Sequence, residues 1–497
     1  MSTTSKSSDI LLLGATGYTG RLVTRYLVTH PQKHLFSLLL GARSTSKLDG
    51  LLKELQVDLS EVGGVKIKQV DVTNEKEVER VVRGVRVVIN TVGPYAKWGT
   101  PVVRACAKHG VHYVDLTGET FWIKEVINEF DYLASKTGAI IVPSCGMDSI
   151  PSDISAFLSN QTLRSLPDGP NYEIKSSITG HKVKGGVSGG TLATAIYALE
   201  NVDKKRLRDG DIPYALSPAP GLQRFGFRLL YDLTFPGLKP LKLVGSWFFM
   251  SNPNRAIVER SQGLLEYHSI VAGAPSNNGS GDVDDDGDGD HLGGTSAIAQ
   301  ELRTTKYGKN FRYDEFMVMS SKVTAFMVIS TFLVGVGLFI LVPPVRWLVM
   351  KILPAGEGPS ERALRSGYLV STNRTEAYNE SSSKDKKKKR EAVIVKSVIR
   401  GKGDPGYFLT SIMLSESALC LLLPSTTSTS STTTSSKSSI SSLTRSSWPL
   451  YAQARRKLPV LAREGGGVFT PATAFGSVLV ERLRATGRFE FESGCEA

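Results

Sequence analysis

The sequence predicts an α/β protein that begins with a Rossmann-type, doubly wound parallel sheet and continues into a second α+β domain. Short apolar runs alternate with helical patterns over the first 150 residues, and a glycine-rich turn follows the first run. The chain beyond that point is less regular and holds one long apolar segment that we expect to contact a membrane or lipid. Buried parallel strands read as continuous apolar runs, so the alternation favours strands with crossover helices.

The elements can be placed in order along the chain. The strand candidates are residues 10–13, 36–40, 65–70, 85–89, 111–116 and 139–142, with helical patterns over 21–29, 101–109 and 121–136. We expect a polar tail over 1–8, a nucleotide-binding domain over 9–150 and the second domain over 151–497. Three polar segments, 274–294, 378–391 and 424–447, have too few apolar residues to offset chain entropy, so we expect disordered insertions there.

Composition excludes several classes of protein. The 497 residues are 41% hydrophobic and 22% charged, as in ordinary globular proteins, and the net charge is +13. An acidic run over 282–290 and a basic run over 384–390 read as solvated loops, and no nucleic-acid motif accompanies them. Four scattered cysteines argue against a disulfide framework or a metal site. The polar first eight residues lack a secretory signal, so we expect a protein that is not secreted.

Residues 323–342 form a stretch of twenty residues without a formal charge. That length suits a membrane-spanning helix. Pro343 and Pro344 would break the helix near its end, and the chain that follows reads as more of the same domain. Three interpretations stay open for the apolar segment 323–350: a spanning helix, a hairpin or interfacial insertion, and a buried core helix. We expect contact with a membrane or lipid surface.

The glycine-rich turn carries the strongest chemical signal. Gly14, Gly17 and Gly20 lie directly after an apolar strand and open a helical pattern. A dinucleotide site needs glycine there for a tight turn, for close approach of the backbone to the pyrophosphate, and for free amides at the helix start. We therefore expect residues of this loop to bind a dinucleotide. The candidates are Gly14, Thr16, Gly17, Tyr18, Thr19 and Gly20.

The end of the second strand bears on the choice of cofactor. NAD enzymes usually carry a carboxylate there for the ribose hydroxyl. This chain has Arg43 and Ser44 instead, with Lys47 beyond. A guanidinium can bind a 2′-phosphate through two hydrogen bonds, so the sequence predicts NADP(H). The alternative for Arg43 is a solvated arginine at a helix start.

The loops after the third and fourth strands should border the same crevice. We expect Asp71 near the adenine, and Asn90, Gly93 and Pro94 near the nicotinamide. Tyr95 is then placed to donate a proton near the substrate. An equally good interpretation is a tyrosine that packs over the loop.

Residues 145–153 leave the last strand of the first domain and lead toward the second. A polar segment at such a junction makes a reasonable active-site wall. Asp148 could orient or supply a proton, or be purely structural, whereas for Asp153 we expect a cap on the next helix. Tyr132 and Lys136 have the spacing of the catalytic pair of short-chain dehydrogenases, but they lie too near a helix end for that role.

Several of these segments together resemble the saccharopine dehydrogenase-like oxidoreductases, a group that includes the bacterial trans-acting enoyl reductases. The segments are 14–20, 41–44, 90–95, 113–119, 145–153, 184–191, 354–360, 403–407 and 466–472. The likeness covers nearly all the chain outside the tail and the three insertions. Met147 departs from the Phe that many relatives carry, and the insertion after Leu423 could displace a helix.

The resemblance implies an NADP(H)-dependent oxidoreductase of lipid or glycolipid metabolism that reduces a polarised double bond. The catalytic candidates are Tyr95 and Asp148, and a helix over 474–486 would pack back on the first domain. A similar animal protein is associated with lipid droplets, so we expect a lipid droplet or cytosol-facing membrane location, with mitochondrial or plasma membranes as alternatives. The expected partners are a lipid-like substrate and a lipid surface, and a homodimer stays open. The alternative function is a catalytically silent, cofactor-binding scaffold at a lipid surface.

Overall fold

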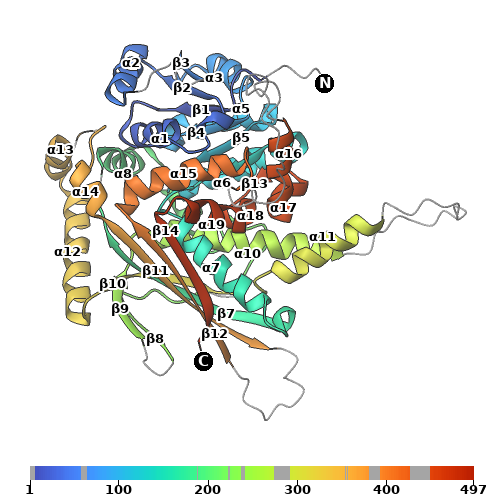
Figure 1. Cartoon of the computed structure of the whole chain (residues 1–497). Coiled ribbons are helices and arrows are strands. Elements are labelled where there is room, and N and C mark those ends of the chain that lie inside the picture. The colour runs from blue at the N-terminus through green and yellow to red at the C-terminus, as the bar shows by residue number, and fades with distance from the viewer. Residues whose placement is uncertain are drawn as a thin grey trace, which may run out of the picture.

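The computed structural model describes residues 6–56, 64–186, 188–221, 224–236, 241–273, 292–352, 354, 356–379, 392–425 and 448–496. Two seven-stranded sheets form the centre of the molecule, the first near the top of Figure 1 and the second below it. The acidic run 282–290 and the basic run 384–390 lie outside the described residues.

The first sheet is parallel throughout, with strand order β13-β6-β5-β4-β1-β2-β3. This confirms the predicted Rossmann-type sheet. Its strands are β1 (Ile10–Leu13), β2 (Leu38–Ala42), β3 (Val65–Gln69), β4 (Val87–Asn90), β5 (His112–Asp115), β6 (Ile140–Val142) and β13 (Gly467–Val468). The order reverses between β1 and β4, which is where open α/β sheets bind ligands. The last strand comes from the far end of the chain.

Helices on both faces connect these strands: α1 (Tyr18–Val28), α2 (Thr45–Glu54), α3 (Glu75–Val82), α4 (Tyr95–Trp98), α5 (Thr100–His109) and α6 (Thr120–Thr137). Helix α6 ends at Gly138, whose φ of 78° is left-handed and suits glycine. Tyr132 therefore lies in the last turns of α6, where it is 75% exposed and its ring stacks under the Lys136 ammonium. This placement agrees with excluding the pair from catalysis.

The second sheet is mixed, with order β14-β12-β11-β7-β10-β9-β8. Only β7 and β10 run parallel among its described pairings. The strands are β7 (Tyr172–Lys184), β8 (Leu230–Phe235), β9 (Leu241–Trp247), β10 (Tyr313–Met319), β11 (Tyr368–Asn379), β12 (Ala392–Lys402) and β14 (Phe489–Glu496). Helix α7 (Ile150–Arg164) packs against β7, β11 and β12, and α10 (Ser251–Gly273) packs against α7 and α11 (Leu292–Thr305).

The remaining helices connect or cover these layers. They are α8 (Gly189–Asn201), α9 (Lys204–Asp211), α12 (Lys322–Leu341), α13 (Pro343–Ile352), α14 (Glu361–Ser366), α15 (Thr410–Cys420), α16 (Trp448–Lys457), α17 (Val460–Glu464), α18 (Pro471–Ala474) and α19 (Gly476–Ala485). Short 3₁₀ or π turns occupy η1 (Lys33–Leu35), η2 (Gly169–Asn171) and η4 (Pro405–Leu409).

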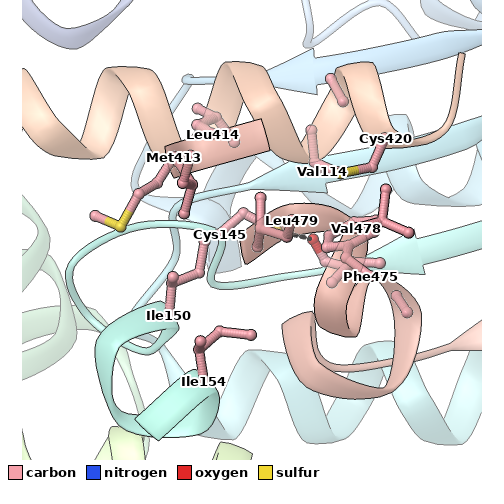
Figure 2. Close-up of a cluster of buried hydrophobic side chains, with 14 of the residues drawn as sticks. Val114, Cys145, Ile150, Ile154, Met413, Leu414, Cys420, Phe475, Val478 and Leu479 are labelled. Carbon is pink, nitrogen blue, oxygen red and sulfur yellow. Dashed lines mark hydrogen bonds between the residues drawn. The ribbon is translucent and has the colours of Figure 1, made fainter. Parts of the chain in front are cut away.

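One hydrophobic core joins the two sheets. Figure 2 shows side chains of β5, α7, α15 and α19 packed together, and all of them are buried: Val114, Ile150, Ile154, Met413, Leu414, Val478 and Leu479. Each large side chain in such a core stabilises the fold by about 1.5–3 kcal/mol. Arg482 of α19 also donates to Gln32 of the nucleotide-binding half at 2.9 Å. The distal chain therefore completes the covering of the first sheet.

The apolar segment lies on the surface. Helix α12 stands at the left edge of Figure 1, and only Ala325 and Ile329 of it are buried. It is one helix that is long and apolar enough to cross a membrane, and 11% of its apolar window is buried. The interpretation as a buried core helix is wrong, because the helix covers only the edge near β8, β9 and β10. Pro343 begins α13, which separates the two helices as predicted.

Two expected insertion bounds need correction. Helix α11 begins at Leu292, within the expected insertion 274–294, and β11 continues to Asn379, past the start of 378–391. In the tail, the Ser7 amide donates to Gly84 at 2.8 Å, so the described end of that segment joins the first domain. The polar sequence does not predict the extent of α11, β11 or the tail, because each of them is held by residues far along the chain.

Candidate active site

The loops after β1 and β4 meet at the reversal point of the first sheet. The Thr91 amide donates to the Leu13 carbonyl at 3.0 Å, and the Thr91 hydroxyl donates to the same oxygen at 2.8 Å. Gly14 has a φ of +80°, and a Cβ there would lie 2.7 Å from Thr91 Oγ1. A Cβ at Gly20 would lie only 2.0 Å from the Gly14 carbonyl oxygen. These two glycines therefore allow the tight turn and the close helix packing.

The start of α1 is open in the way an anion site requires. Gly17 is its N-cap, no side chain caps the helix, and its first turn carries no acid. A Cβ at Gly17 would meet only the Gly14 oxygen, at 3.3 Å, so its outer side is open space. Backbone amides of Tyr18, Thr19 and Gly20 can then donate to a pyrophosphate, assisted by the helix dipole. The turn fits a dinucleotide.

Arg43 and Asp71 lie at the neighbouring strand ends. Arg43 is exposed, and among the described residues no carboxylate forms an ion pair with it. Ser44 caps α2 by accepting from the Lys47 amide at 3.4 Å. Asp71 accepts from the Thr73 amide and hydroxyl at 2.9 and 2.8 Å, and these bonds, with the nearby Arg43, lower the pKa of Asp71. The free guanidinium suits a 2′-phosphate.

The loop after β4 is held from beneath. Asn90 is buried, its amide donates to the Tyr113 hydroxyl at 3.2 Å, and its side-chain oxygen accepts from the Val92 amide at 3.1 Å. Gly93 and Pro94 follow, joined by a cis peptide. Asn90 therefore shapes this loop, and the exposed Gly93 lies where a cofactor ring would pass.

Tyr95 lies under the loop. It is 6% exposed, its hydroxyl donates to the Asn90 carbonyl at 3.0 Å, and its ring centroid is 5.5 Å from that of Trp122. Burial raises the pKa of the Tyr95 hydroxyl, and the Asp115 charge adds to the shift. This geometry matches the packing interpretation, so Tyr95 supports the loop.

Asp148 differs from the other buried acids. It is half-buried, and among the described residues no group is hydrogen-bonded to its carboxylate. Burial raises the pKa of Asp148 to about 6. A Cβ at Gly118 would lie 3.8 Å from its Oδ2, and its charge also raises the pKa of Tyr95 and Tyr407, for which burial is the larger cause. A partly exposed carboxyl with a pKa of about 6 keeps a protonated fraction near neutral pH and can donate a proton.

Two further acids, Asp115 and Glu119, lie beside the same loops, and the sequence alone predicts no role for them. Asp115 accepts from the Tyr113 hydroxyl at 2.8 Å and from the Thr117 and Ser144 amides at 3.0 and 2.9 Å. Burial raises its pKa to about 7. Glu119 accepts from the Tyr95 and Ala96 amides at 2.6 and 2.8 Å. Both carboxylates hold loops beside the reversal point of the sheet. The sequence signal for Asp115 was its place near the end of the apolar run 111–116. Glu119 had no such signal.

Three distant segments of the second half meet at the glycine turn. The Tyr18 hydroxyl donates to the Pro359 carbonyl, and the Tyr18 ring lies edge-on to Tyr407 with centroids 5.3 Å apart. The Tyr407 oxygen accepts from the Ser188 amide at 2.5 Å. Asp404 accepts from the Gly186 and Tyr407 amides, both at 2.8 Å. Tyr18 therefore joins segments 184–191, 354–360 and 403–407 into one wall.

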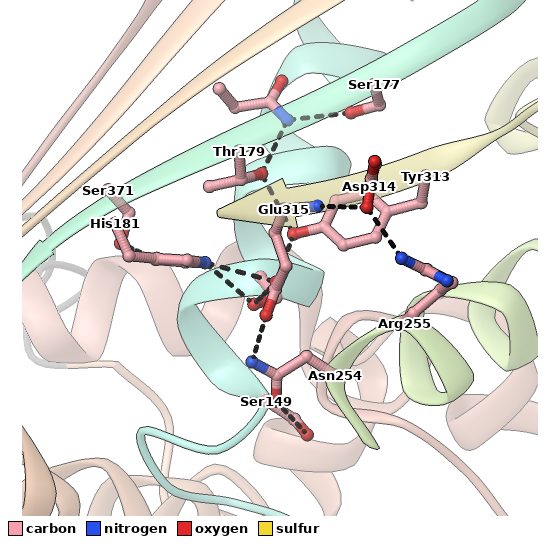
Figure 3. Close-up of polar contacts among 12 residues, drawn as sticks. Ser149, Ser177, Thr179, His181, Asn254, Arg255, Tyr313, Asp314, Glu315 and Ser371 are labelled. Atoms are coloured by element: carbon pink, nitrogen blue, oxygen red, sulfur yellow. Dashed lines mark hydrogen bonds and ion pairs between the residues drawn. The ribbon is translucent and has the colours of Figure 1, made fainter. Parts of the chain in front are cut away.

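A buried polar network fixes the segment that follows Asp148 (Figure 3). Its centre is Glu315 on β10, whose carboxylate accepts from Ser152 at 2.6 Å and from Asn254 at 2.7 Å. The Tyr313 hydroxyl donates to the same carboxylate at 2.9 Å, and the His181 ring nitrogen lies 3.2 Å from it. The first turn of α7 is thereby tied to the second sheet, which positions the preceding loop.

Asp153 does not cap its own helix, contrary to expectation. It accepts from the Ser261 hydroxyl at 2.6 Å and from the Ala472 amide at 2.8 Å, at the start of α18. Burial raises its pKa to about 7. The carboxylate thus serves a distant helix start, which local sequence rules do not reveal. Within the described residues, no three His, Cys, Asp or Glu side chains group together in a way that could hold a metal ion.

The chain is similar to several known proteins. Residues 10–142 match the saccharopine dehydrogenase NADP binding domain. A Mycobacterium tuberculosis protein, provisionally named a trans-acting enoyl reductase, is 30% identical over 98% of both chains. A trans-acting enoyl reductase of Mycobacterium bovis is 27% identical, again over 98% of both chains. Apo saccharopine dehydrogenase (L-Glu forming) from Saccharomyces cerevisiae overlaps 99% of this chain at 11% identity, with a TM-score of 0.45.

The full-length match and the domain match agree with the glycine turn, the strand order and the exposed Arg43 guanidinium. NADP(H), when bound, supplies a hydride to an acceptor or takes one up. The chain belongs to the saccharopine dehydrogenase-like family, together with the trans-acting enoyl reductases, and is an NADP(H)-binding oxidoreductase.

Proposed function

We propose that this protein uses NADPH to reduce a polarised carbon–carbon double bond in a lipid, with Asp148 as the proton donor. The single observation that carries the proposal is the Asp148 carboxyl. It combines a pKa of about 6, partial exposure and no hydrogen-bond partner among the described residues. The names of the mycobacterial relatives support the choice of an enoyl acceptor.

Each part of the site has its own role in the proposed reaction. The amides at the start of α1 bind the pyrophosphate, Arg43 binds the 2′-phosphate, and the Asn90–Pro94 loop orients the nicotinamide end. In an enoyl substrate the carbonyl polarises the double bond, so hydride adds at the β-carbon. Asp148 then gives its proton to the α-carbon, and the carboxylate regains a proton from solvent through its exposed side. Tyr95 supports the loop and takes no proton.

The lipid character of the substrate rests on the exposed apolar helix α12. In water, the twenty residues of this helix would expose a large apolar patch. Such a patch is typical of membrane or lipid contact. We place the protein at a lipid droplet or a cytosol-facing membrane, with the crevice supplied from that surface. A silent scaffold needs the same helix but no proton donor, and the open Asp148 carboxyl favours the enzyme.

The test compares Asp148→Asn with Asp168→Asn. Asp168 is exposed and follows the end of α7. That helix is about 22 Å long, so Asp168 lies far from Asp148, which precedes the start of the helix. We expect Asp148→Asn to keep NADPH affinity and to lose about 10²–10⁴-fold in turnover of enoyl thioesters, the usual contribution of a general acid. Asp168→Asn should behave as the parent. NADPH binding without turnover of any enoyl compound by the parent protein would favour the scaffold.

A further inference from the structure

An aromatic path leads from the exposed helix toward the crevice. Phe332 of α12 stacks on Phe249, with centroids 5.8 Å apart, and lies 6.2 Å from Trp247. Phe249 is 47% exposed and Phe332 is 37% exposed, so both form part of the molecular surface. These three side chains make a continuous apolar surface between α12 and the end of β9.

The path continues to the proposed proton donor. Met250 follows Phe249 directly and is half-buried. A Cβ at Gly118 would lie 3.3 Å from Met250 Cε and 3.8 Å from Asp148 Oδ2, so both side chains approach the same point beside Gly118. Adjacent residues of one segment therefore reach both the lipid-facing helix and the carboxyl.

The second helix of the apolar pair reaches the opposite wall of the crevice. Helix α13 packs against α8, where Arg346 lies 3.8 Å from Glu200. On α8, Thr194 Oγ1 would lie 3.7 Å from a Cβ at Gly93, in the loop that borders the nicotinamide end. The helix pair α12–α13 thus contacts elements on both sides of the site.

The charges at the end of this pair suit a bilayer. Trp347 is 65% exposed, and the Lys351 ammonium lies 5.1 Å from its ring centroid. An amphipathic ring beside a cation is typical of the membrane–water interface. The net charge of +13 favours an anionic surface.

We infer that the substrate is a bilayer-resident enoyl lipid whose acyl chain enters laterally along Phe332, Phe249 and Met250 to reach Asp148. The inference rests on the proposed reductase activity and names how its substrate arrives. An acyl chain that leaves a bilayer for water loses favourable burial with every methylene. A continuous apolar surface from membrane to carboxyl avoids that loss, whereas a soluble substrate would need no such surface.

The experiment uses the full chain with Phe249→Ser and Phe332→Ser, and Tyr132→Ser as the control at an exposed aromatic on α6. Two substrates are compared: a short, water-soluble trans-2-enoyl thioester, and a long-chain trans-2-enoyl glyceride in phosphatidylcholine vesicles that contain phosphatidylglycerol. NADPH oxidation gives kcat and KM for each. Phe332→Leu, which keeps an apolar side chain, guards against a folding effect.

We expect both Ser variants to raise KM for the vesicle substrate at least tenfold and to leave kcat/KM for the short thioester within twofold. The Leu variant and the control should match the parent. Equal activity of Ser variants and parent on vesicles, or an equal loss on both substrates, would overturn the uptake path. So would parent activity on the short thioester, or on a chain carried by a soluble protein, with none on vesicles. A parent inactive on every substrate would instead refute the proposed reductase.

Discussion

At the scale of single residues, the site separates two kinds of carboxyl. Asp115 and Glu119 accept several hydrogen bonds and hold loops, whereas Asp148 accepts none from the described residues. Hydrogen bonds to a carboxylate stabilise its charged form and oppose the effect of burial. In Asp148 burial acts alone and raises the pKa to about 6, so the carboxyl loses its proton about two pH units above an ordinary aspartate.

The pH dependence of turnover follows from that proton. Asp148 donates only when protonated, so turnover should fall tenfold per pH unit above a pKa of about 6. In Asp148→Asn the residual activity should lack this limb. Initial rates between pH 5 and 9, at saturating NADPH, provide the measurement. A limb of the same midpoint in the variant would assign the proton to another group.

We expect Arg43 to determine the preference for NADPH over NADH. Replacing it by alanine should weaken NADPH binding about 10- to 100-fold, because charged hydrogen bonds contribute about 1.5–3 kcal/mol, and should leave NADH affinity unchanged. Arg80→Ala, on the exposed face of α3, is the matched control. Fluorescence titration with both cofactors measures the ratio. An unchanged preference for NADPH in Arg43→Ala would place the 2′-phosphate elsewhere.

At the scale of elements, two features decide whether the crevice forms: the turn into α1 and the attachment of α7 to the second sheet. Both depend on close contacts that a single side chain would disturb. In the turn the space is needed by a ligand. In α7 the contacts are hydrogen bonds within the protein.

Gly17 separates binding from folding in the turn. Its φ of −72° suits any residue, and a side chain there would point into the open space at the helix start. The added Cβ would lie 3.3 Å from the Gly14 carbonyl oxygen, so Gly17→Val should lower the melting temperature by only about a few degrees and abolish detectable NADPH affinity. Gly50→Val, where a Cβ on α2 meets nothing within 4 Å, controls for the substitution itself. Calorimetric titration that finds normal affinity in Gly17→Val would remove the pyrophosphate from this turn.

Glu315 tests the attachment of α7. Three donors and a ring nitrogen of His181 surround its buried carboxylate, and Glu315→Gln would turn an amide donor toward some of them. We expect a loss of about 1–3 kcal/mol in the free energy of unfolding, the cost of leaving buried groups unsatisfied. Glu492→Gln, which removes an exposed ion pair with Arg400, should cost below about 1 kcal/mol. Urea denaturation gives both values, and equal losses would argue against the network.

At the scale of the whole molecule, the exposed face of α12 is the feature that a water-soluble enzyme would not need. Leu333 and Val334 are 46% and 64% exposed and contribute little to the core. Leu333→Asp with Val334→Asp should abolish cosedimentation with phosphatidylglycerol-containing vesicles and leave NADPH affinity intact. The same double change at Leu133 and Tyr132 of α6 is the control. Vesicle binding that persists in the α12 variant would locate lipid contact on another surface.

The local order of residues determined the first half of the fold. Each apolar run became a strand because parallel strands are buried on both faces, and the glycine spacing placed the phosphate turn. Arg43, and the absence of a carboxylate at the end of the second strand, pointed to NADP(H), as the matched domain has it. These features depend on neighbours within a few residues, which is the range over which sequence patterns carry information.

Only the tertiary structure decided how the distant parts meet. The attachment of β13 to β6, the wall around Tyr18, and the helix start that Asp153 serves join residues hundreds of positions apart. The tertiary structure also decided that α12 is exposed and not buried, because the sequence pattern of an apolar helix is the same in both cases. Such contacts depend on packing and burial across the whole chain, and no local pattern records that the Asp148 carboxyl has no hydrogen-bond partner among the described residues.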